Sequence, residues 1–324
     1  MSDVTIAALF ASPDHYLHAF DGDDAVFVRM DRAAYRRSIF LDARIDPAQP
    51  GALRVPAAAL LAGFGPTPET GWIFHIAHCG STLLARALGE LTRSLVLREP
   101  LALRQLAVAP DSRRLGLVLR MLGKRYPEGG PTLVKANVPV NFVLPDIVAA
   151  QPAARAVMLH LGPRDYLLAI LRSDNHRRWL RGVTDELRGP LGDLSGGDDA
   201  QRAAALWLAQ TERFAAAVQT MPAARVLDAE RFFVEPEAAL VAAARCLGVE
   251  ADATAAAALV GGPLFATYSK NPAVAFDNRE RLARRAKLAV LLEPELERAE
   301  AWLEARSAQV HRAQQRLREA ALMA

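Results

Sequence analysis

The sequence is poor in cysteine, has no long apolar run and has almost no net charge. Its two cysteines, Cys79 and Cys246, cannot form a disulfide framework or a spaced zinc motif, which favours a reducing, cytoplasmic setting. No run is long enough to span a bilayer, and the first residues lack the basic segment of a secretory signal. Because 39 basic residues barely exceed 36 acidic ones, the chain lacks the dense positive field of a nucleic-acid binder. We expect a soluble protein that binds neither membrane nor nucleic acid, although an anionic small ligand fits this balance.

Short β-rich runs alternate with helical segments from residue 71 onward. In order, the pairs are GWIFHIA with STLLARALGEL, SLVL with residues 101–122, TLVKA with VPVNFVLPDIVAA, RAVMLHL with RDYLLAILRS, and ARVLD with PEAALVAAARCLGV. Repeated β-α units need crossover connections, so they predict a mainly parallel sheet with helices on both faces. With 324 residues, 52% of them apolar, the chain can bury such a core. We expect a three-layer α/β/α domain over residues 71–277.

The flanking segments have different patterns. Residues 1–70 predict a β-rich extension, because YLHAF and AVFVRM enclose an Asp-Gly turn as the strands of a hairpin do. Residues 278–324 predict a helical tail, in which Pro294 can occupy the first turn of a second helix. The Gly- and Asp-rich residues 188–200 predict a mobile surface loop or a lid.

The tail has large apolar residues at a spacing of seven. They are Leu296, Leu303, Val310 and Leu317. This spacing is typical of a coiled-coil seam, which would make the protein a homodimer through its C-terminal helix. It is also the pattern of a long amphipathic helix that packs on its own domain, which is the commoner use of such a stripe.

The first β-α turn, FHIAHCGSTLLARAL at residues 74–88, has the composition of an anion-binding loop. Gly80 allows close approach of the backbone, and the hydroxyls of Ser81 and Thr82 can donate to an anion at the start of the following helix. A Walker A loop would have a lysine after the glycine, whereas Ser81 follows Gly80 here. The alternative is an ordinary Ser/Thr helix cap, which needs only one hydroxyl.

Several motifs occur in an order that resembles the sulfotransferase superfamily. They are the loop without lysine, the Glu-Pro pair in VLREPL, TLVKAN, ALWLAQTERF, RVLDAERFFVEPEAALVAAARCLGV and TYSKNPAVAFDNRERLARR, and together they cover residues 71 to about 285. The resemblance implies a P-loop-type fold and transfer of a sulfuryl group from 3'-phosphoadenosine 5'-phosphosulfate (PAPS). The acceptor would be a hydroxyl or amine of a small molecule, and the mechanism requires no metal.

The resemblance also implies which residues bind PAPS. They are His78, Cys79, Gly80, Ser81, Thr82, Leu83, Arg164, Arg172, Ser173 and Lys270. The chain departs from the family where His78 and Cys79 precede Gly80, and where Leu161 and Ala169 occupy the usual positions of the 3'-phosphate clamp. Arg164, Arg172, Ser173 and Lys270 are therefore expected as substitutes for that clamp.

Three residues are candidates for the chemistry. Glu99 is the expected general base, while a protonated His78, assisted by Lys135, would stabilise the leaving phosphate. Such a histidine predicts activity that falls at alkaline pH. Other readings remain for two of them: Glu99 can cap a helix or pair with an arginine such as Arg98 or Arg104, and Lys135 can end a strand in solvent.

Neighbouring residues admit other roles. His75, His78 and Cys79 together are an alternative zinc site. The helix start would lower the pKa of Cys79 and make its thiol open to alkylation. The basic residues Arg172, Arg177, Arg178 and Arg181 either close on a phosphate or form a solvated helix end, and Asp228 and Glu230 are expected to cap the helix after them.

Two other functions remain open. A P-loop kinase or nucleotide-binding protein would need a magnesium-binding carboxylate and a substitute for the missing lysine, for which Lys135 is the candidate. A degenerate family member would keep the fold and bind a partner or an anion without catalysis.

Overall fold

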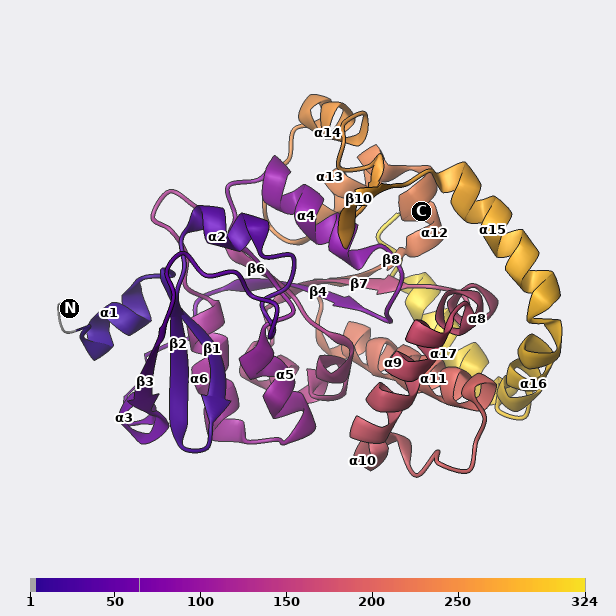
Figure 1. Ribbon diagram of the computed structural model, residues 1–324, viewed down its shortest axis with the longest axis horizontal. Coiled ribbons are helices and arrows are strands. Elements are labelled where there is room, and N and C mark those ends of the chain that lie inside the picture. Colours follow the sequence, from indigo (N-terminus) through magenta and orange to yellow (C-terminus); the bar gives the residue numbers. More distant parts are fainter. Residues whose placement is uncertain (1–3, 64, 324) are drawn as a thin grey trace.

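A computed structural model describes residues 4–63 and 65–323 and has a five-stranded parallel sheet at its centre (Figure 1). The strands are β4 (Thr70–His75), β5 (Val96–Arg98), β6 (Thr132–Lys135), β7 (Arg155–His160) and β8 (Ala224–Asp228), in the spatial order β5-β6-β4-β7-β8. Every neighbouring pair is parallel, as the β-α alternation predicted. The strand order reverses beside β4, so the turn after β4 opens at the carboxyl edge of the sheet, where ligands of such folds bind.

Helices cover both faces of the sheet, which confirms the three-layer prediction (Figure 1). One face has α4 (Ser81–Leu91), α12 (Ala229–Val234), α13 (Pro236–Cys246) and α14 (Ala253–Val260). The other has α5 (Leu101–Val108), the 3-10 helix η1 (Val138–Phe142), α7 (Leu144–Ala150), α8 (Pro163–Leu171) and α11 (Asp199–Thr220), with α6 (Ser112–Leu122) and α9 (Asp174–Glu186) beside them. The expected helical stretch 101–122 is two helices, because Pro110 interrupts it and Asp111 caps the second.

The N-terminal extension is β-rich, as predicted, and lies against the edge strand β5. Its antiparallel sheet consists of β1 (His15–Asp21), β2 (Asp24–Arg29) and β3 (Ala52–Pro56), with short helices α1 (Ile6–Ala11), α2 (Arg32–Arg37) and α3 (Ala57–Leu61). The Leu41 N–H donates to the Arg98 carbonyl at 2.7 Å, and the Leu101 N–H donates to the Leu41 carbonyl at 3.2 Å. The extension therefore holds the backbone on both sides of Glu99.

The Gly- and Asp-rich stretch is more regular than expected. Residues Arg188–Leu191 form a short helix, α10, and residues 192–197 follow it outside any helix or strand. Asp198 then caps α11 by accepting the Gln201 N–H at 2.9 Å. The aspartates at its end therefore start a helix rather than a loop.

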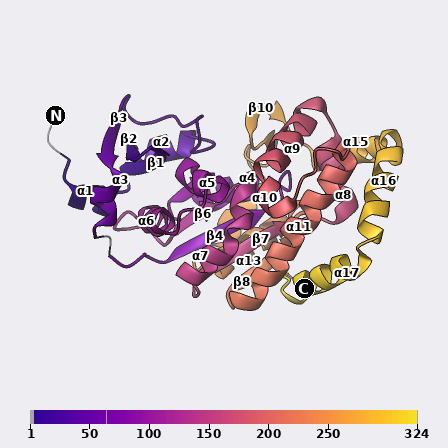
Figure 2. The same cartoon turned by 90° about the horizontal axis from the view of Figure 1, so that it is seen from below.

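The C-terminal tail folds back along its own domain (Figure 2). A two-stranded hairpin of β9 (Thr267–Tyr268) and β10 (Asn271–Ala275) precedes it, and the tail itself consists of α15 (Asn278–Leu291), α16 (Glu293–Glu304) and α17 (Ser307–Glu319). The last residues reach β8, where the Leu322 N–H donates to the Val226 carbonyl at 2.7 Å.

The apolar residues that recur every seven positions in the tail pack against a helix of the same chain. Leu296, Leu303 and Leu317 are buried, and α16 and α17 pack on α11. The predicted dimer seam is therefore wrong for this stripe, because its leucines already cover a helix of the same chain. The tail is also two helices after α15, since Ala305 and Arg306 separate α16 from α17. No helix in the described residues combines the length and apolarity needed to cross a membrane.

Candidate anion-binding active site

The loop between β4 and α4 has an unusual backbone. Ala77, His78 and Gly80 have φ angles of 75°, 50° and 81°. Left-handed conformations are costly for residues with a Cβ and occur mainly at functional sites. Successive residues of this kind turn their N–H groups toward one point, as anion-binding nests do. Gly80 is required there, because a Cβ at this position would lie 2.8 Å from Cζ of Phe233.

The hydroxyls at the start of α4 do not cap the helix. Gly80, which has no side chain, is the N-cap residue, so neither hydroxyl caps the helix. Ser81 and Thr82 are buried, and Oγ1 of Thr82 has no hydrogen-bond partner. A buried polar atom without a partner is expensive and rare. The ordinary-cap interpretation is therefore wrong, and the unused donors fit an anion at the helix start.

A cavity of about 680 Å³ opens in front of this loop. Its walls are the loop and the start of α4, one side of α8, the β9–β10 hairpin, and α15. Its charged lining residues are Asp165, Arg172, Glu230, Lys270, Arg281, Arg284 and Arg285. Since positive side chains outnumber carboxylates in this list, the cavity favours an anionic ligand.

The two carboxylates of the cavity neutralise only part of its positive charge. Glu230 accepts hydrogen bonds from Nη1 and Nη2 of Arg281 at 2.7 and 2.8 Å, and it lies 2.9 Å from Nη1 of Arg285. The same Arg285 nitrogen lies 3.2 Å from Asp165. Among the described residues, the other three cations, Arg172, Lys270 and Arg284, have no carboxylate partner. They are available to a ligand.

Lys270 is placed at the tip of the β9–β10 hairpin. Its side chain lines the cavity, where solvent still reaches part of it but the surrounding protein crowds its ammonium group, and its Nζ lies 5.9 Å from the ring centre of Phe40 in the N-terminal extension. Burial within the surrounding protein, and then the nearby Lys135, lower the pKa of Lys270. Such crowding of positive charge is relieved when an anion binds.

His78 packs among rings of α9. Its ring centre lies 4.4 Å from that of His176 and 5.5 Å from that of Trp179. Burial lowers the pKa of His78 well below its usual value, and the cations Lys270 and Arg172 lower it further. This lowered pKa favours a neutral imidazole near pH 7 and argues against the protonated His78 and the alkaline loss of activity expected from the sequence.

Cys79 is fully buried behind the loop. Burial raises the pKa of its thiol, and this effect outweighs the backbone N–H of Ser81, which acts in the opposite direction. The expected low pKa and reactivity toward alkylating reagents are therefore wrong, because water and reagents do not reach the sulfur.

Glu99 and Lys135 form a short ion pair at the ends of β5 and β6. Nζ of Lys135 donates to Oε1 of Glu99 at 2.5 Å. The Lys135 side chain is fully buried, whereas 15% of the Glu99 side chain is exposed, so only the carboxylate can meet a ligand. Glu99 also has a φ angle of 57°, another strained position at this edge. The alternative of a solvent-exposed Lys135 is wrong.

Neither arginine considered as a partner of Glu99 contacts it. The Arg98 guanidinium donates to backbone carbonyls of residues 35–39, and Arg104 pairs with Glu186 at 2.5 Å. Neither Glu99 nor Lys135 lines the cavity, but both interact electrostatically with Lys270, which does.

His75 orients this arrangement, a role that its position in the sequence did not reveal. Its Nδ1 accepts the Ala77 N–H at 3.0 Å, and its Nε2 lies 3.0 Å from both Nζ of Lys135 and the Ala136 carbonyl. Both ring nitrogens are therefore occupied by the loop and by β6. The described residues contain no group of three His, Cys, Asp or Glu side chains suited to a metal, so the zinc alternative finds no support among them.

Arg164 and Ser173 lie outside the cavity. Arg164 pairs with Glu293 at 2.8 Å and Glu300 at 2.7 Å on α16, which corrects its predicted role in binding PAPS. Ser173 contacts Nδ1 of His176 at 2.6 Å and so positions a residue of the cavity rather than lining it. The other residues expected to bind PAPS line the cavity: His78, Cys79, Gly80, Ser81, Thr82, Leu83, Arg172 and Lys270.

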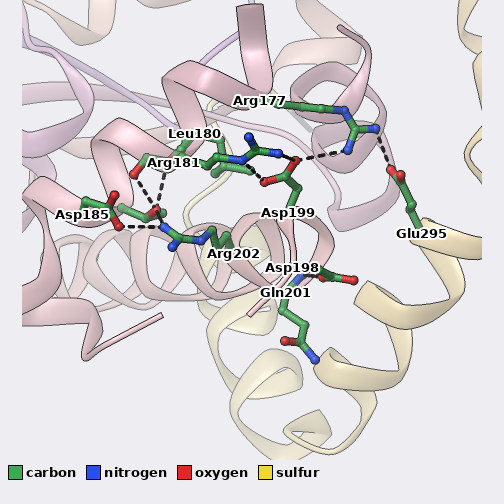
Figure 3. Close-up of polar contacts among 10 residues, drawn as sticks. Arg177, Leu180, Arg181, Asp185, Asp198, Asp199, Gln201, Arg202 and Glu295 are labelled. Carbon is green, nitrogen blue, oxygen red and sulfur yellow. Dashed lines mark hydrogen bonds and ion pairs between the residues drawn. The ribbon is translucent and has the colours of Figure 1, made fainter. Parts of the chain in front are cut away.

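The other arginines of the basic run belong to a structural ion-pair network. Figure 3 shows Arg177 and Arg181 of α9 directed at Asp199 of α11, so this aspartate joins the two helices. Arg177 also reaches Glu295 of the tail at 2.7 Å, and Arg178 donates to Asn175. Of the four arginines, only Arg172 reaches the cavity.

Several cavity residues were not assigned from the sequence. Arg281, Arg284 and Arg285 lie in the RERLARR segment. His176 and Tyr268 also line the cavity. The repeated arginines of that segment were the available signal. Asp228 caps α12 as expected, by accepting the Glu230 and Arg231 N–H groups, whereas the Glu230 side chain faces the cavity arginines.

Comparison with known proteins gives little further information. No family model matches the chain, and no curated protein matches it. A crystal structure of a sulfotransferase from Alicyclobacillus acidocaldarius is similar with 15% identity and a TM-score of 0.41, over 74% of this chain and 97% of that chain.

Proposed function

We propose that this protein is a sulfotransferase that moves a sulfuryl group from PAPS to a hydroxyl or amine of a small molecule. The observation that supports the proposal best is the loop at residues 77–82, whose left-handed backbone and the start of α4 form the wall of a basic cavity, with Oγ1 of Thr82 left without a hydrogen-bond partner. The motif order described above supports PAPS as the donor.

The residues of the cavity fit such a donor. Gly80, Ser81 and Thr82 would hold its sulfate-bearing end, and Arg172, Arg284 and Lys270 would hold its phosphates. These cations take the place of the clamp that Leu161 and Ala169 do not provide. When bound, PAPS supplies an activated sulfuryl group.

Glu99 acts as the general base in this proposal. Its carboxylate would accept the proton of the acceptor hydroxyl or amine, and Lys135 holds that carboxylate in place by a hydrogen bond of 2.5 Å. Lys270, rather than His78, would stabilise the negative charge that develops on the leaving phosphate oxygen. Phe40 of the N-terminal extension lies beside Lys270, with the Lys270 Nζ 5.9 Å from its ring centre, so in this proposal the extension would contact the acceptor.

The kinase alternative has less support from the same residues. Its magnesium ion would need a free carboxylate in the cavity, but Glu230 and Asp165 are held by arginines. Its replacement lysine would be Lys135, whose fully buried ammonium group is bound to Glu99.

Calorimetric titration with adenosine 3',5'-bisphosphate, the product of PAPS, tests the proposal. We expect one bisphosphate to bind, and Thr82→Ala to weaken its binding about tenfold because a charge-assisted hydrogen bond is lost. Thr220→Ala, at an exposed helix end, is the matched control. Binding of ATP with magnesium but not of the bisphosphate would support the kinase instead. Bisphosphate binding without sulfuryl transfer to any acceptor of a broad panel would support the non-catalytic alternative.

A further inference from the structure

A second cavity, of about 650 Å³, lies on the far side of α4 from the loop. Its walls are α2 of the extension, the C-terminal half of α4, the segment that leads into β5, and Glu128. It shares no lining residue with the first cavity. The motifs discussed above and the proposed reaction leave it without a role.

The second cavity is strongly basic. Its charged lining residues are Arg32, Arg36, Glu90, Arg86, Arg93, Arg98 and Glu128. Arg32 is neutralised by Glu128 at 2.6 Å. Arg36 and Arg93 have no side-chain partner within the described part of the chain, and the arginines exceed the glutamates. The cavity therefore carries more positive than negative side chains, and the side chains of two of its arginines, Arg36 and Arg93, make no hydrogen bond or ion pair among the described residues.

The wall of this cavity contains unused and fixed donors. Ser94 is buried, and its Oγ has no hydrogen-bond partner. Arg98 is held in place because its guanidinium donates to the carbonyls of Tyr35, Ser38 and Ile39. Arg86 uses Nη1 for the Ser269 carbonyl at 2.9 Å. A hydroxyl donor beside fixed and free guanidinium groups is the donor set that recognises a tetrahedral oxyanion.

We infer that the second cavity is a separate binding site for a sulfate or phosphate group, either as the free ion or as part of a small ester. Arg36 and Arg93 provide the mobile cations of this site, and Ser94 provides a buried donor. The positive charges of Arg98 and Arg86 interact unfavourably, and an anion bound here would relieve this repulsion. The site differs from the loop at residues 77–82 in position and in all its residues.

Crystals of the full chain soaked in sodium tungstate locate such a site directly. We expect an anomalous peak among Arg36, Arg93 and Ser94, and none there in the Arg36→Gln/Arg93→Gln variant. Both arginines are exposed and unpaired, so this variant should unfold at the same urea concentration as the unaltered protein. A peak only at the start of α4, with the second cavity empty, overturns the inference.

Calorimetry with sodium sulfate at constant ionic strength provides the solution test. The double variant should lose at least tenfold in affinity at one of two sites, while Arg312→Gln/Arg316→Gln, which removes two exposed arginines of α17, should change neither. Equal isotherms for the two variants overturn the inference. Repeating the titration with phosphate and with p-nitrophenyl sulfate distinguishes a free ion from a small ester as the ligand. Tighter binding of the ester than of the free ions would indicate an ester, and equal binding would indicate the free ion.

Discussion

Gly80 shows how one residue type determines the shape of the anion-binding loop. Its φ angle of 81° is accessible to glycine at little cost, and the space beside it is filled by Phe233. The sequence predicted the need for close backbone approach at this position. It did not predict the strained Ala77 and His78, because those conformations are imposed by His75 and by packing from α9.

Gly80→Ala should lower the free energy of unfolding by about 2–4 kcal/mol, through the left-handed backbone and the clash with Phe233. Gly22→Ala is the control: its φ angle is 59°, but nothing lies within 4 Å of the added Cβ, so about 1–2 kcal/mol is expected. Urea unfolding of both variants measures the difference. Equal losses would show that the contact with Phe233 does not matter.

Glu99→Gln should reduce kcat by at least about a hundredfold while leaving the Kd for adenosine 3',5'-bisphosphate nearly unchanged. The reason is that the carboxylate does not line the cavity that would hold the nucleotide. Steady-state kinetics and calorimetry on the same preparation test this. A parallel loss of turnover and of bisphosphate affinity would make Glu99 a structural partner of Lys135.

At the scale of helices and strands, α8 explains why one predicted arginine reaches the cavity and another does not. Asp165, Leu168, Ala169 and Arg172 recur at helical spacing and line the cavity, whereas Arg164 lies outside this face. Periodicity predicted the helix, but its rotation about its axis is set by contacts with α11 and α16, which are distant in sequence. The β-α alternation and the loop position were therefore predictable, while the partners of individual arginines were not.

The pairing of α16 with α11 gives an element-scale prediction. Leu303→Ala should lower the free energy of unfolding by about 2–5 kcal/mol, because it leaves a cavity between packed helices. Leu291→Ala, on a residue that is 74% exposed, should change it by less than about 0.5 kcal/mol. Urea unfolding and sedimentation measure both. If Leu303→Ala instead changed the protein from a dimer to a monomer without loss of stability, the stripe would form an interface between two copies of the chain.

At the scale of the whole molecule, the extension, the α/β domain and the tail build one site together. Leu41 of the extension holds the backbone around Glu99, the hairpin supplies Lys270, and α15 supplies Arg284. These contacts join segments far apart in sequence, so no local pattern predicted them. The same convergence buries histidines from several elements.

Those histidines predict that the protein loses stability in acid. Burial lowers the pKa of His160 to about 4, and the pKa values of His75, His78 and His176 are lowered too. Because the unfolded chain binds protons at a usual pKa near 6.5, the folded state is favoured above that pH and loses stability as the pH falls toward 4. His160 alone should account for about 2 kcal/mol between pH 7 and 5.

Urea unfolding at pH 7 and pH 5 measures this loss, and His160→Gln separates the contribution of one residue. The glutamine has no charge to gain, so its variant should show a pH dependence smaller by about that amount. If the variant and the unaltered protein lose stability equally between the two pH values, His160 is not the source.

Arg86 stands between the two cavities: it lines one of them, and its Nη1 holds the Ser269 carbonyl next to Lys270 in the other. A ligand that drew this guanidinium into the second cavity would remove a support from the lysine of the first. Thermodynamic linkage then requires each ligand to change the affinity of the other by the same factor. If both sites are occupied as proposed, this single side chain would couple the binding of an anion in one cavity to the binding of an anion in the other.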